Sequence, residues 1–410
     1  MSFSIANTGL SAVTEQLNTI SNNIANSGTK GFKSGRTEFA SMYAQSQPLG
    51  VAVSGVSQSI NKSGSLDKTG INTDLAIAGS GFFVVKDSAG DTAYTRAGMF
   101  STDNNGNLIS SSGMKLQGYP ADAAGNLQTG VVTDLQINNA GLAAKATGKI
   151  TLAANLQASA KEITVATFSP TNKDSYNFME QTTVYDSLGN KHSLVHYFIK
   201  KASTPASTTP TPTPATSNWK VNYVLDGTTL PTTHDLTFDT SGKLTNTTPL
   251  APLTGKFSQS DVAGYNIAVD YTGTTQFDGA FATASKKSDG YTAGIKNGER
   301  IEGDGSVYAT FSNGERMLQG KLVLANFANP NGLATQNGTT WSETGKSGAA
   351  LLGAPGSGLL GNIETGALES SNVDLTAELV GLMTAQRNYQ ANTKIISTND
   401  SMMNALFQVL

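Results

Sequence analysis

The sequence predicts a mostly β protein with an α-helix at each terminus, and three observations support this. Apolar residues recur at spacings of three and four at both ends, as on the seam of a coiled coil. The residues between them read as short strand-like runs separated by turn-forming Gly, Asn and Pro. Charged residues make up only 14% of the 410 residues, against roughly 25% in ordinary soluble domains. We therefore expect N- and C-terminal helices that pair as a coiled-coil-like core domain, with two nested β domains, sandwich- or barrel-like, between them.

Two apolar stripes define the terminal helices. The predicted self-assembly residues lie along them and are Leu10, Val13, Leu17, Ile20, Ile24, Leu379, Leu382, Gln386, Tyr389, Ile396, Met403, Phe407 and Leu410. The first stripe consists of Phe3, Ala6, Leu10, Val13, Leu17, Ile20 and Ile24. The second consists of Leu379, Leu382, Tyr389, Ile396, Met403, Phe407 and Leu410, interrupted by the polar seam residues Gln386, Thr393 and Asp400. Polar seam residues lower stability but fix register. We also hypothesise that they soften the core so that neighbouring copies slide.

The stripes have two readings. An amphipathic helix is commonly one element of its own domain's core. These stripes, however, share a period and lie at the extreme ends, and Gly/Ser-rich segments separate them from the β region. Because an isolated helix of this size is marginal in water, the preferred reading is that the helices order when copies of the chain assemble.

The boundaries of both helices are marked by capping residues. Asn26, Gly28 and Gly31 are expected to end the first helix. Asp374 is expected to cap the second, with Glu378 in its first turn, where the helix dipole favours a carboxylate.

The rest of the chain divides into nested segments. The predicted parts are 1–27 with 374–410 as the helical core, 28–73 with 345–373 as a connector containing an extended piece or small hairpin, 74–145 with 284–344 as the first β domain, and 146–283 as an inserted outer β domain. The predicted strands include Leu75–Ile77, Phe82–Val85, Met114–Tyr119, Ile150–Leu156, Ile163–Phe168, Thr182–Tyr185, Leu194–Ile199, Trp219–Leu225 and Lys321–Phe327. Asn297-Gly298 and Asn313-Gly314 predict hairpin turns. The Pro/Thr-rich residues 202–217 predict an exposed hairpin loop.

Composition argues against several classes of protein. The chain has no cysteine, which excludes disulfides and thiolate chemistry. Its net charge of −3 does not indicate a basic surface that would bind nucleic acid or acidic lipid. Lys30, Lys33 and Arg36 are interpreted as solvated surface cations. No run approaches the roughly 18 apolar residues of a membrane span. The N-terminus does not resemble a cleaved signal peptide, so we expect a cytoplasmic protein or export without one.

The candidate ligand-binding motifs lack the neighbouring residues or secondary structure that their chemistry requires. Gly79-Ser80-Gly81 lies between strands, with no helix to bind phosphate, and Gly345-Lys346-Ser347 lacks the first glycine of a P-loop. Asp103, Asn105 and Asn107 resemble the start of a calcium loop, but Met114 stands where its glutamate belongs. The remaining candidates are the three histidines, His192, His196 and His234. His192 and His196 lie on a strand, where side chains four residues apart are about 13 Å apart, too far for one zinc ion. We expect no catalytic, cofactor or metal site, and no enzyme.

Several runs resemble the flagellar rod and hook protein family. The run 22–33 (NNIANSGTKGFK) resembles the N-terminal signature of that family, and 366–375 (GALESSNVDL), continuing through 386–392 (QRNYQAN), resembles the C-terminal one. Asp74-Leu75-Ala76-Ile77, Gly81-Phe82-Phe83 and 94–98 (YTRAG) resemble the family's first β domain. The resemblance covers about 1–145 and 285–410. The middle resembles hook subunits in size and position more than in motif.

The resemblance implies a structural, non-enzymatic subunit of the flagellar hook. Such subunits leave the cell through the flagellar type III export apparatus and self-assemble into a curved, flexible hollow tube, a universal joint that carries torque from rod to filament. The implied partners are further copies of the chain, the distal rod protein, the hook cap, the hook–filament junction protein and the export apparatus, at an extracellular location in the flagellum. Phe39 and Tyr43 are similar to the family's export-gate motif; a hydrophobic pair in a connector strand explains them equally well.

Two alternatives stay open. A distal rod or other axial flagellar protein would share both terminal signatures, but the large insert at about 146–283 favours the hook. A secreted fibrous adhesin would also combine β domains with helices, but it usually carries a leader and forms a fixed small oligomer.

Overall fold

The computed structural model describes residues 2–44, 47–122, 125–206, 215–245, 250–258 and 261–409. They form two compact units. Unit 1 comprises Met1–Asn139, Asn297–Thr310 and Arg316–Leu410, and unit 2 comprises Ala140–Lys296 and Phe311–Glu315. The predicted fold class is confirmed: most regular structure is β, and a helix lies at each end. The finer four-part division of the chain stays a prediction.

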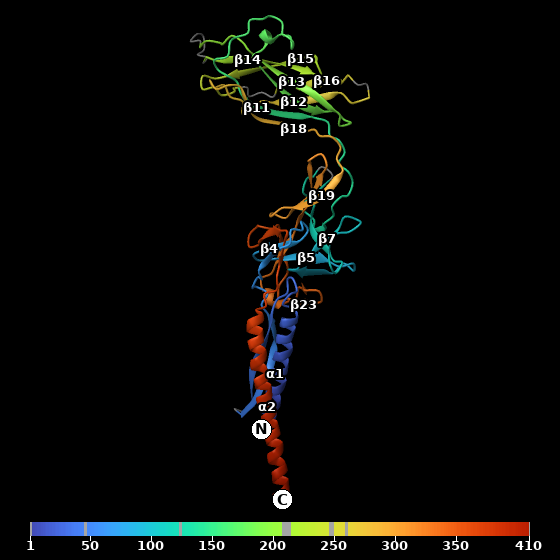
Figure 1. Cartoon of the computed structure of the whole chain (residues 1–410), viewed down its shortest axis with the longest axis vertical. Coiled ribbons are helices and arrows are strands. Elements are labelled where there is room, and N and C mark those ends of the chain that lie inside the picture. Colours follow the sequence, from blue (N-terminus) through green and yellow to red (C-terminus); the bar gives the residue numbers. More distant parts are fainter. Residues whose placement is uncertain are drawn as a thin grey trace. The chain divides into compact units, whose positions relative to one another are not determined.

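Unit 1 contains both helices, α1 (Ser2–Ala25) and α2 (Leu375–Val409), which lie side by side (Figure 1). The helix α1 ends directly before Asn26, as predicted. Asp374 caps α2, since its Oδ1 accepts the amides of Thr376 and Ala377 at 3.0 and 3.1 Å. The two helices run antiparallel: Asn23 near the end of α1 bonds to Glu378 near the start of α2.

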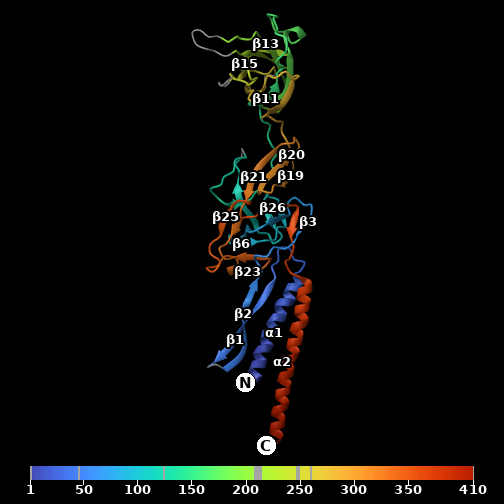
Figure 2. The same cartoon turned by 90° about the vertical axis from the view of Figure 1, so that its left-hand side faces the viewer.

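A β-hairpin follows α1. Its strands are β1 (Gly35–Ala44) and β2 (Gln47–Gln58), paired antiparallel with two register shifts. The hairpin packs along α1, on a different side from α2 (Figure 2). Of the two forms expected for this segment, the structure therefore has the hairpin.

The β body of unit 1 is a branched sheet with the strand order β19-β20-β21-β9-β5-β6-β24-β23, joined by β7, β8, β10, β22 and β25, plus the pairs β26-β4 and β27-β3. Aromatic side chains fill one core cluster, in which Phe82 packs edge-on against Phe327 and Trp341. The strands are β3 (Leu66–Lys68), β4 (Leu75–Ala78), β5 (Phe82–Lys86), β6 (Thr92–Thr95), β7 (Phe100–Thr102), β8 (Leu108–Ser110), β9 (Lys115–Pro120), β10 (Thr133–Asp134), β19 (Lys296–Ile301), β20 (Ser306–Phe311), β21 (Arg316–Leu322), β22 (Leu324–Asn326), β23 (Ala334–Gln336), β24 (Thr340–Ser342), β25 (Leu351–Gly353), β26 (Asn362–Thr365) and β27 (Ala367–Glu369), with a short 3-10 turn at Pro330–Gly332.

The residues expected to connect the sheet to α2 are themselves paired strands. β25, β26 and β27 lie within 345–373 and pair with β22, β4 and β3. The C-terminal flank therefore pairs with earlier strands three times before α2 begins, once in the branched sheet through β25 and twice in separate two-stranded pairs. Through β27 and β3, the C-terminal signature is paired with residues 66–68.

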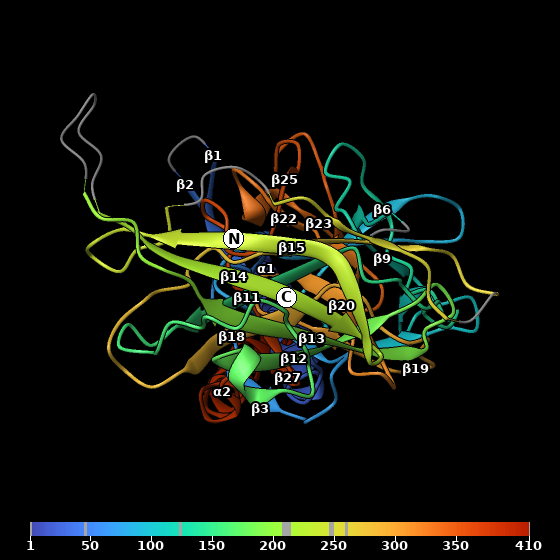
Figure 3. The ribbon, with the colours of Figure 1, turned by 90° about the horizontal axis from the view of Figure 1, so that it is seen from above.

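Unit 2 consists of two four-stranded sheets, ordered β16-β17-β11-β18 and β12-β13-β14-β15; Figure 3 shows β13, β14 and β15 side by side. Both sheets supply the same core, in which Ile150, Trp219 and Phe238 are fully buried, so unit 2 is built as a two-sheet sandwich. Its elements are β11 (Lys149–Asn155), β12 (Phe178–Tyr185), β13 (Lys191–Lys200), β14 (Ser217–Leu225), β15 (Thr228–Phe238), β16 (Leu253–Gly255), β17 (Tyr265–Asp270) and β18 (Ala282–Ser288), with a 3-10 turn at Lys173–Ser175.

Some local predictions hold and two are wrong. The turn Asn313-Gly314 joins β20 and β21, as predicted. Asn297-Gly298 lies inside β19 instead of at a turn. Ile163–Phe168 is not a strand, because β12 and β14 already pair with the two sides of β13. The Ile163 amide donates a hydrogen bond to the Lys200 carbonyl oxygen at 3.0 Å, at the very end of β13. The loop 202–217 joins β13 to β14, with its residues 207–214 outside the described ones.

A buried hydrogen-bond chain in unit 2 fixes the tautomers of two histidines. Nε2 of His234 lies 2.7 Å from the carbonyl oxygen of Ala251, so it carries the proton and Nδ1 accepts from the Tyr223 hydroxyl at 2.6 Å. Tyr223 in turn accepts from Tyr271 at 3.0 Å, and Tyr271 accepts from Nδ1 of His196 at 2.8 Å. His196 is therefore protonated on Nδ1, and its Nε2 is buried without a partner among the described residues.

This arrangement makes unit 2 acid-sensitive. Burial lowers the pKa of His196 from 6.5 to about 3, with Glu180 opposing and His234 and Lys286 reinforcing the shift. Between these values the unfolded chain binds the extra proton and the folded chain does not. Stability should therefore fall as pH drops below 6.5, by about 1.4 kcal/mol per pH unit.

The measurement uses denaturant unfolding followed by Trp219 fluorescence in a Trp341→Phe background, which leaves unit 2 with the sole tryptophan. His196→Gln should flatten the slope of stability against pH in that range, although it also loses packing. A slope identical to that of the parent would show that another group carries the acid sensitivity.

Candidate functional site

The helix pair has a small apolar seam. Val13 and Ile20 of α1 pack against Ala385 of α2, with Leu17, Ile24 and Leu382 partly buried around them. Ala385 is fully buried, although it lies outside the predicted stripe. The seam of α2 therefore runs through Leu382 and Ala385 and not through the full predicted stripe.

Small residues let the two helices approach closely. A Cβ built on Gly9 would come within 3.1 Å of Asn392, and one on Gly381 within 3.4 Å of Ile20. Gly9, Gly381 and Ala385 therefore place small residues along the contact between the two helices. Gly381 and Ala385, four residues apart on one helix face, were the sequence signal for this contact.

Asn23 fixes the helix pair to the hairpin. Its Oδ1 accepts the Gly35 amide at 2.8 Å, and its Nδ2 donates to the Gly35 carbonyl at 2.8 Å and to Glu378 at 2.9 Å. The Thr37 hydroxyl also donates to the Thr19 hydroxyl at 2.9 Å. Because Asn23 is 2% exposed, its loss would leave several buried groups unpaired.

The first turns of α2 carry apolar side chains that the described part of the chain leaves exposed. In its first turns Leu375, Leu379, Val380 and Met383 are 46–54% exposed. We call these four residues the outer patch. A single exposed Leu, Val or Met side chain is ordinary on a protein surface, but a contiguous set of exposed apolar side chains indicates an interaction site.

The predicted α2 residues are divided between seam and surface. Leu382 contacts the seam, whereas Leu379, Tyr389 and Met403 are 40–49% exposed. Gln386, Thr393 and Asp400 are exposed and do not line the α1 seam. In the predicted α1 stripe, Val13, Leu17, Ile20 and Ile24 contact α2. Of the other α1 residues, Ala6 is buried, Leu10 is half-buried and Phe3 is exposed. In α2, Ile396 is half-buried, the Phe407 side chain is not described and Leu410 lies outside the described residues. Their role in self-assembly stays a prediction.

Phe39 and Tyr43 are on β1, 45% and 67% exposed. Phe39 pairs with Val53, which is 36% exposed. The hairpin thus also carries uncovered apolar side chains, and the role of Phe39 and Tyr43 in export stays a prediction.

A buried ion cluster joins three distant parts of unit 1. Lys33 Nζ lies 2.6 Å from Glu369 Oε1, and Arg96 Nη1 lies 3.1 Å from Oε2; the three side chains are at most 5% exposed. Burial lowers the pKa of Lys33 and of Arg96, while Glu369 opposes both shifts. The prediction that Lys33 is a solvated surface cation is wrong, because β27 brings a carboxylate over it.

Backbone groups extend the cluster. Lys33 also donates to the Lys62 carbonyl at 2.8 Å, and Arg96 donates to the Gly79 carbonyl at 2.9 Å. Glu369 Oε1 also accepts the Gly64 amide at 3.0 Å. Because each end of the cluster is tied to a different loop, Glu369 holds the N-terminal arm, the first β strands and the C-terminal flank in one arrangement.

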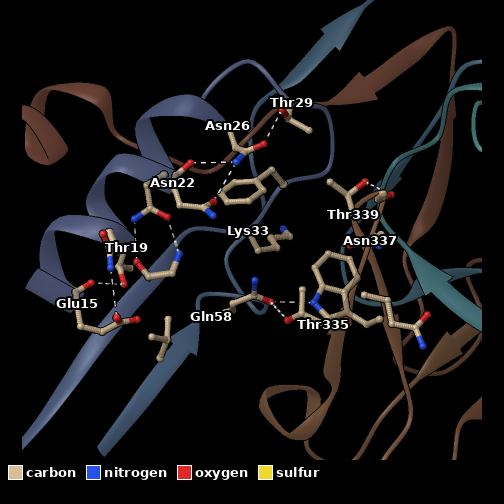
Figure 4. Close-up of a pocket in the computed structure, with 18 residues that line it drawn as sticks. Glu15, Thr19, Asn22, Asn26, Thr29, Lys33, Gln58, Thr335, Asn337 and Thr339 are labelled. Atoms are coloured by element: carbon tan, nitrogen blue, oxygen red, sulfur yellow. Dashed lines mark hydrogen bonds between the residues drawn. The ribbon is translucent and has the colours of Figure 1, made fainter. Parts of the chain in front are cut away.

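A polar groove of about 590 Å³ lies between α1 and the turn that joins β23 to β24. Glu15, Asn18, Asn22 and Asn26 line it from α1, and Figure 4 shows Asn337 and Thr339 on the opposite side. The groove is lined chiefly by amides and hydroxyls, so it offers hydrogen bonds more than acid–base chemistry.

The turn reading of Asp103 is confirmed. Its Oδ1 accepts the amides of Asn105 and Asn107 at 2.8 Å, and its Oδ2 accepts the Asn107 side chain at 2.8 Å. Across the described ranges, no group of three or more metal-binding side chains comes together. Among the helices that the structure describes, none is long and apolar enough to cross a membrane.

Four segments match families of flagellar proteins. They are 3–33 (flagella basal body rod protein), 76–167 (flagellar hook protein FlgE/F/G D1 domain), 151–291 (flagellar basal body protein FlaE D2 domain) and 364–409 (flagellar basal body rod FlgEFG protein C-terminal). The flagellar hook protein FlgE of Escherichia coli K12 is 39% identical to this chain over 99% of both chains. This chain belongs to the flagellar hook protein family.

Further members of the hook protein family are similar to this chain over nearly its whole length. The hook protein FlgE of Salmonella typhimurium LT2 is 39% identical over 99% of both chains, and that of Rhizobium meliloti is 32% identical over 97% of this chain and 96% of the relative. The crystal structure of Helicobacter pylori flagellar hook protein FlgE2 has the same fold: it covers 74% of this chain and all of its own, with a TM-score of 0.56 at 16% identity. The resemblance to the flagellar rod and hook family is confirmed.

Proposed function

We propose that this chain is the structural, non-enzymatic subunit of the flagellar hook and that it self-assembles through its terminal helices into a curved, flexible hollow tube. The observation that carries the proposal is the outer patch of α2, whose four apolar side chains are half-exposed in the single chain. Membership of the hook family supports the same role. The tube would act as a universal joint that transmits torque from rod to filament.

The arrangement around α1 favours an open polymer. One side of α1 carries α2 with its outer patch, and another carries the hairpin, where Phe39 and Val53 are uncovered. These two apolar surfaces differ from each other, and contact between unlike surfaces of identical copies gives a head-to-tail assembly. Such an assembly grows into a helical filament when its rotation does not close.

The further partners follow from the same proposal. Hook subunits would meet the distal rod protein at one end of the tube and the hook cap and hook–filament junction protein at the other. The subunit would reach its extracellular site through the flagellar type III export apparatus. Phe39 and Tyr43 would be the residues read by the export gate.

Electron microscopy of the purified, concentrated chain tests the proposal. Curved tubes are the expected product. Straight rods would instead favour a distal rod protein, and discrete small oligomers would favour a secreted adhesin.

Unit 2 should be dispensable for polymer formation. Leu142 and Gly294 exchange two backbone hydrogen bonds at 2.8 and 2.9 Å, so they face each other across a ladder. Replacing 143–293 by a two-residue Asn-Gly turn should close the chain with little strain. Because α1, α2 and the hairpin are all retained, the shortened chain should still form tubular polymer. If it stays monomeric although circular dichroism shows folded helices, contacts of unit 2 are required.

A further inference from the structure

Five Asn-Gly pairs occur in the chain, at Asn105, Asn297, Asn313, Asn331 and Asn337. Asparagine before glycine can lose its side-chain amide, because glycine has no side chain to block attack by its own backbone nitrogen. That attack needs a glycine N–H which is free of an acceptor and an asparagine side chain which is free to turn. The fold can therefore protect or expose each pair.

Four of the pairs are held by hydrogen bonds. Asn297 lies inside β19, where its Oδ1 accepts the Thr310 hydroxyl at 2.9 Å. The other three glycine amides donate to backbone carbonyls at 3.0 Å: Gly106 to Asp103, Gly314 to Phe311 and Gly332 to Asn329.

Asn337 differs on each count. It is exposed in the β23–β24 turn, and neither its side chain nor the Gly338 amide has a hydrogen-bond partner within the part of the chain that the structure describes. The space around a Cβ placed on Gly338 is open. The asparagine side chain therefore has room to reach the following nitrogen.

The turn also activates that nitrogen. The Thr340 hydroxyl donates to the Asn337 carbonyl at 2.8 Å, and this carbonyl belongs to the same peptide group as the Gly338 N–H. A hydrogen bond to the carbonyl draws electrons from the amide and makes its N–H more acidic. The neighbouring backbone is constrained as well, since Thr339 has φ 58°, a value that branched side chains rarely adopt.

We propose that Asn337 is a site of spontaneous deamidation. The Gly338 nitrogen loses its proton and bonds to Cγ of Asn337, the Cγ–Nδ2 bond breaks, and ammonia leaves with that proton. Water then opens the succinimide ring to aspartate or isoaspartate. The product adds a negative charge at the mouth of the polar groove, across from the α1 residues Glu15 and Asn22, so that older subunits differ in charge from new ones.

The test follows each Asn-Gly pair by peptide mass spectrometry while the native full chain is incubated at neutral and mildly alkaline pH. The Asn337 peptide should convert first, faster at higher pH, with isoaspartate detected. The other four should stay amidated. In the urea-unfolded chain all five should convert, which shows that the fold protects the four. Equal protection of Asn337, or earlier conversion of another pair in the native chain, would overturn the proposal.

Two variants sharpen the test. Thr340→Val keeps the shape of a side chain that is 3% exposed and should slow the conversion several-fold in the native chain, but not in urea. An unchanged native rate would overturn the role of the hydroxyl. Asn337→Gln, whose longer side chain cyclises poorly, should abolish the product, and persistence of isoaspartate in the same peptide would contradict the assignment.

Discussion

Met383→Asp should abolish polymer formation while leaving each chain folded. Met383 is 52% exposed in the single chain, so a carboxylate there costs the fold little. In the proposed polymer the same position is covered by a neighbouring copy, and an unpaired buried charge is strongly disfavoured. A penalty of about 3 kcal/mol raises the critical concentration for assembly roughly 100-fold. Sedimentation and electron microscopy would measure the loss, and circular dichroism would show the retained helices.

Asn388→Asp is the matched control. It introduces the same charge at an exposed polar position of α2 that lies on a different side of the helix from Met383, and should leave assembly near that of the parent chain. Val380→Asp should reproduce the effect of Met383→Asp, because Val380 belongs to the outer patch. If Met383→Asp assembled normally, the outer patch would not be an intersubunit contact.

Glu369→Gln should destabilise unit 1 by about 3–5 kcal/mol, since removal of one partner leaves buried charge uncompensated. The substitution keeps the shape of the side chain but leaves the Lys33 and Arg96 cations facing each other with no anion between them. Denaturant unfolding followed by Trp341 fluorescence, in a Trp219→Phe background, measures the change in unit 1.

The pH dependence identifies the mechanism. Burial lowers the pKa of Lys33 from 10.5, and loss of Glu369 removes the main opposing effect. Between the folded value and 10.5 the unfolded chain binds more protons, so the variant should regain stability as pH rises through that window. Asp67→Asn, which removes the exposed partner of Lys30, is the control and should change stability far less. If the Glu369→Gln chain were as stable as the Asp67→Asn chain, the buried ion cluster would not be what holds the parts of unit 1 together.

The fold was predictable from the sequence where periodicity is long. The terminal helices, the Asp374 cap and the Asn313-Gly314 turn each rest on local chemistry that the three-dimensional structure does not override. The predictions for Ile163–Phe168 and Asn297-Gly298 were wrong because these segments depend on the three-dimensional structure around them. Strand formation depends on an available edge, and an Asn-Gly pair forms a turn only where the chain reverses.

The candidate site was predictable only in part. A heptad pattern shows that a helix has an apolar face, but it does not show which residues meet the partner helix. Small residues at Gly381 and Ala385 set that contact, and so Leu379 became surface. Lys33 looked like an ordinary surface cation because its partner is more than three hundred residues away.

The central claim is that the terminal helices hold the polymer together, and a helical reconstruction of the assembled chain by electron microscopy tests it most directly. The expected map shows α1 and α2 around the lumen of a hollow tube, with Val380 and Met383 covered by a neighbouring copy. A polymer in which the outer patch faces solvent, with the copies joined only through their β units, would contradict the claim.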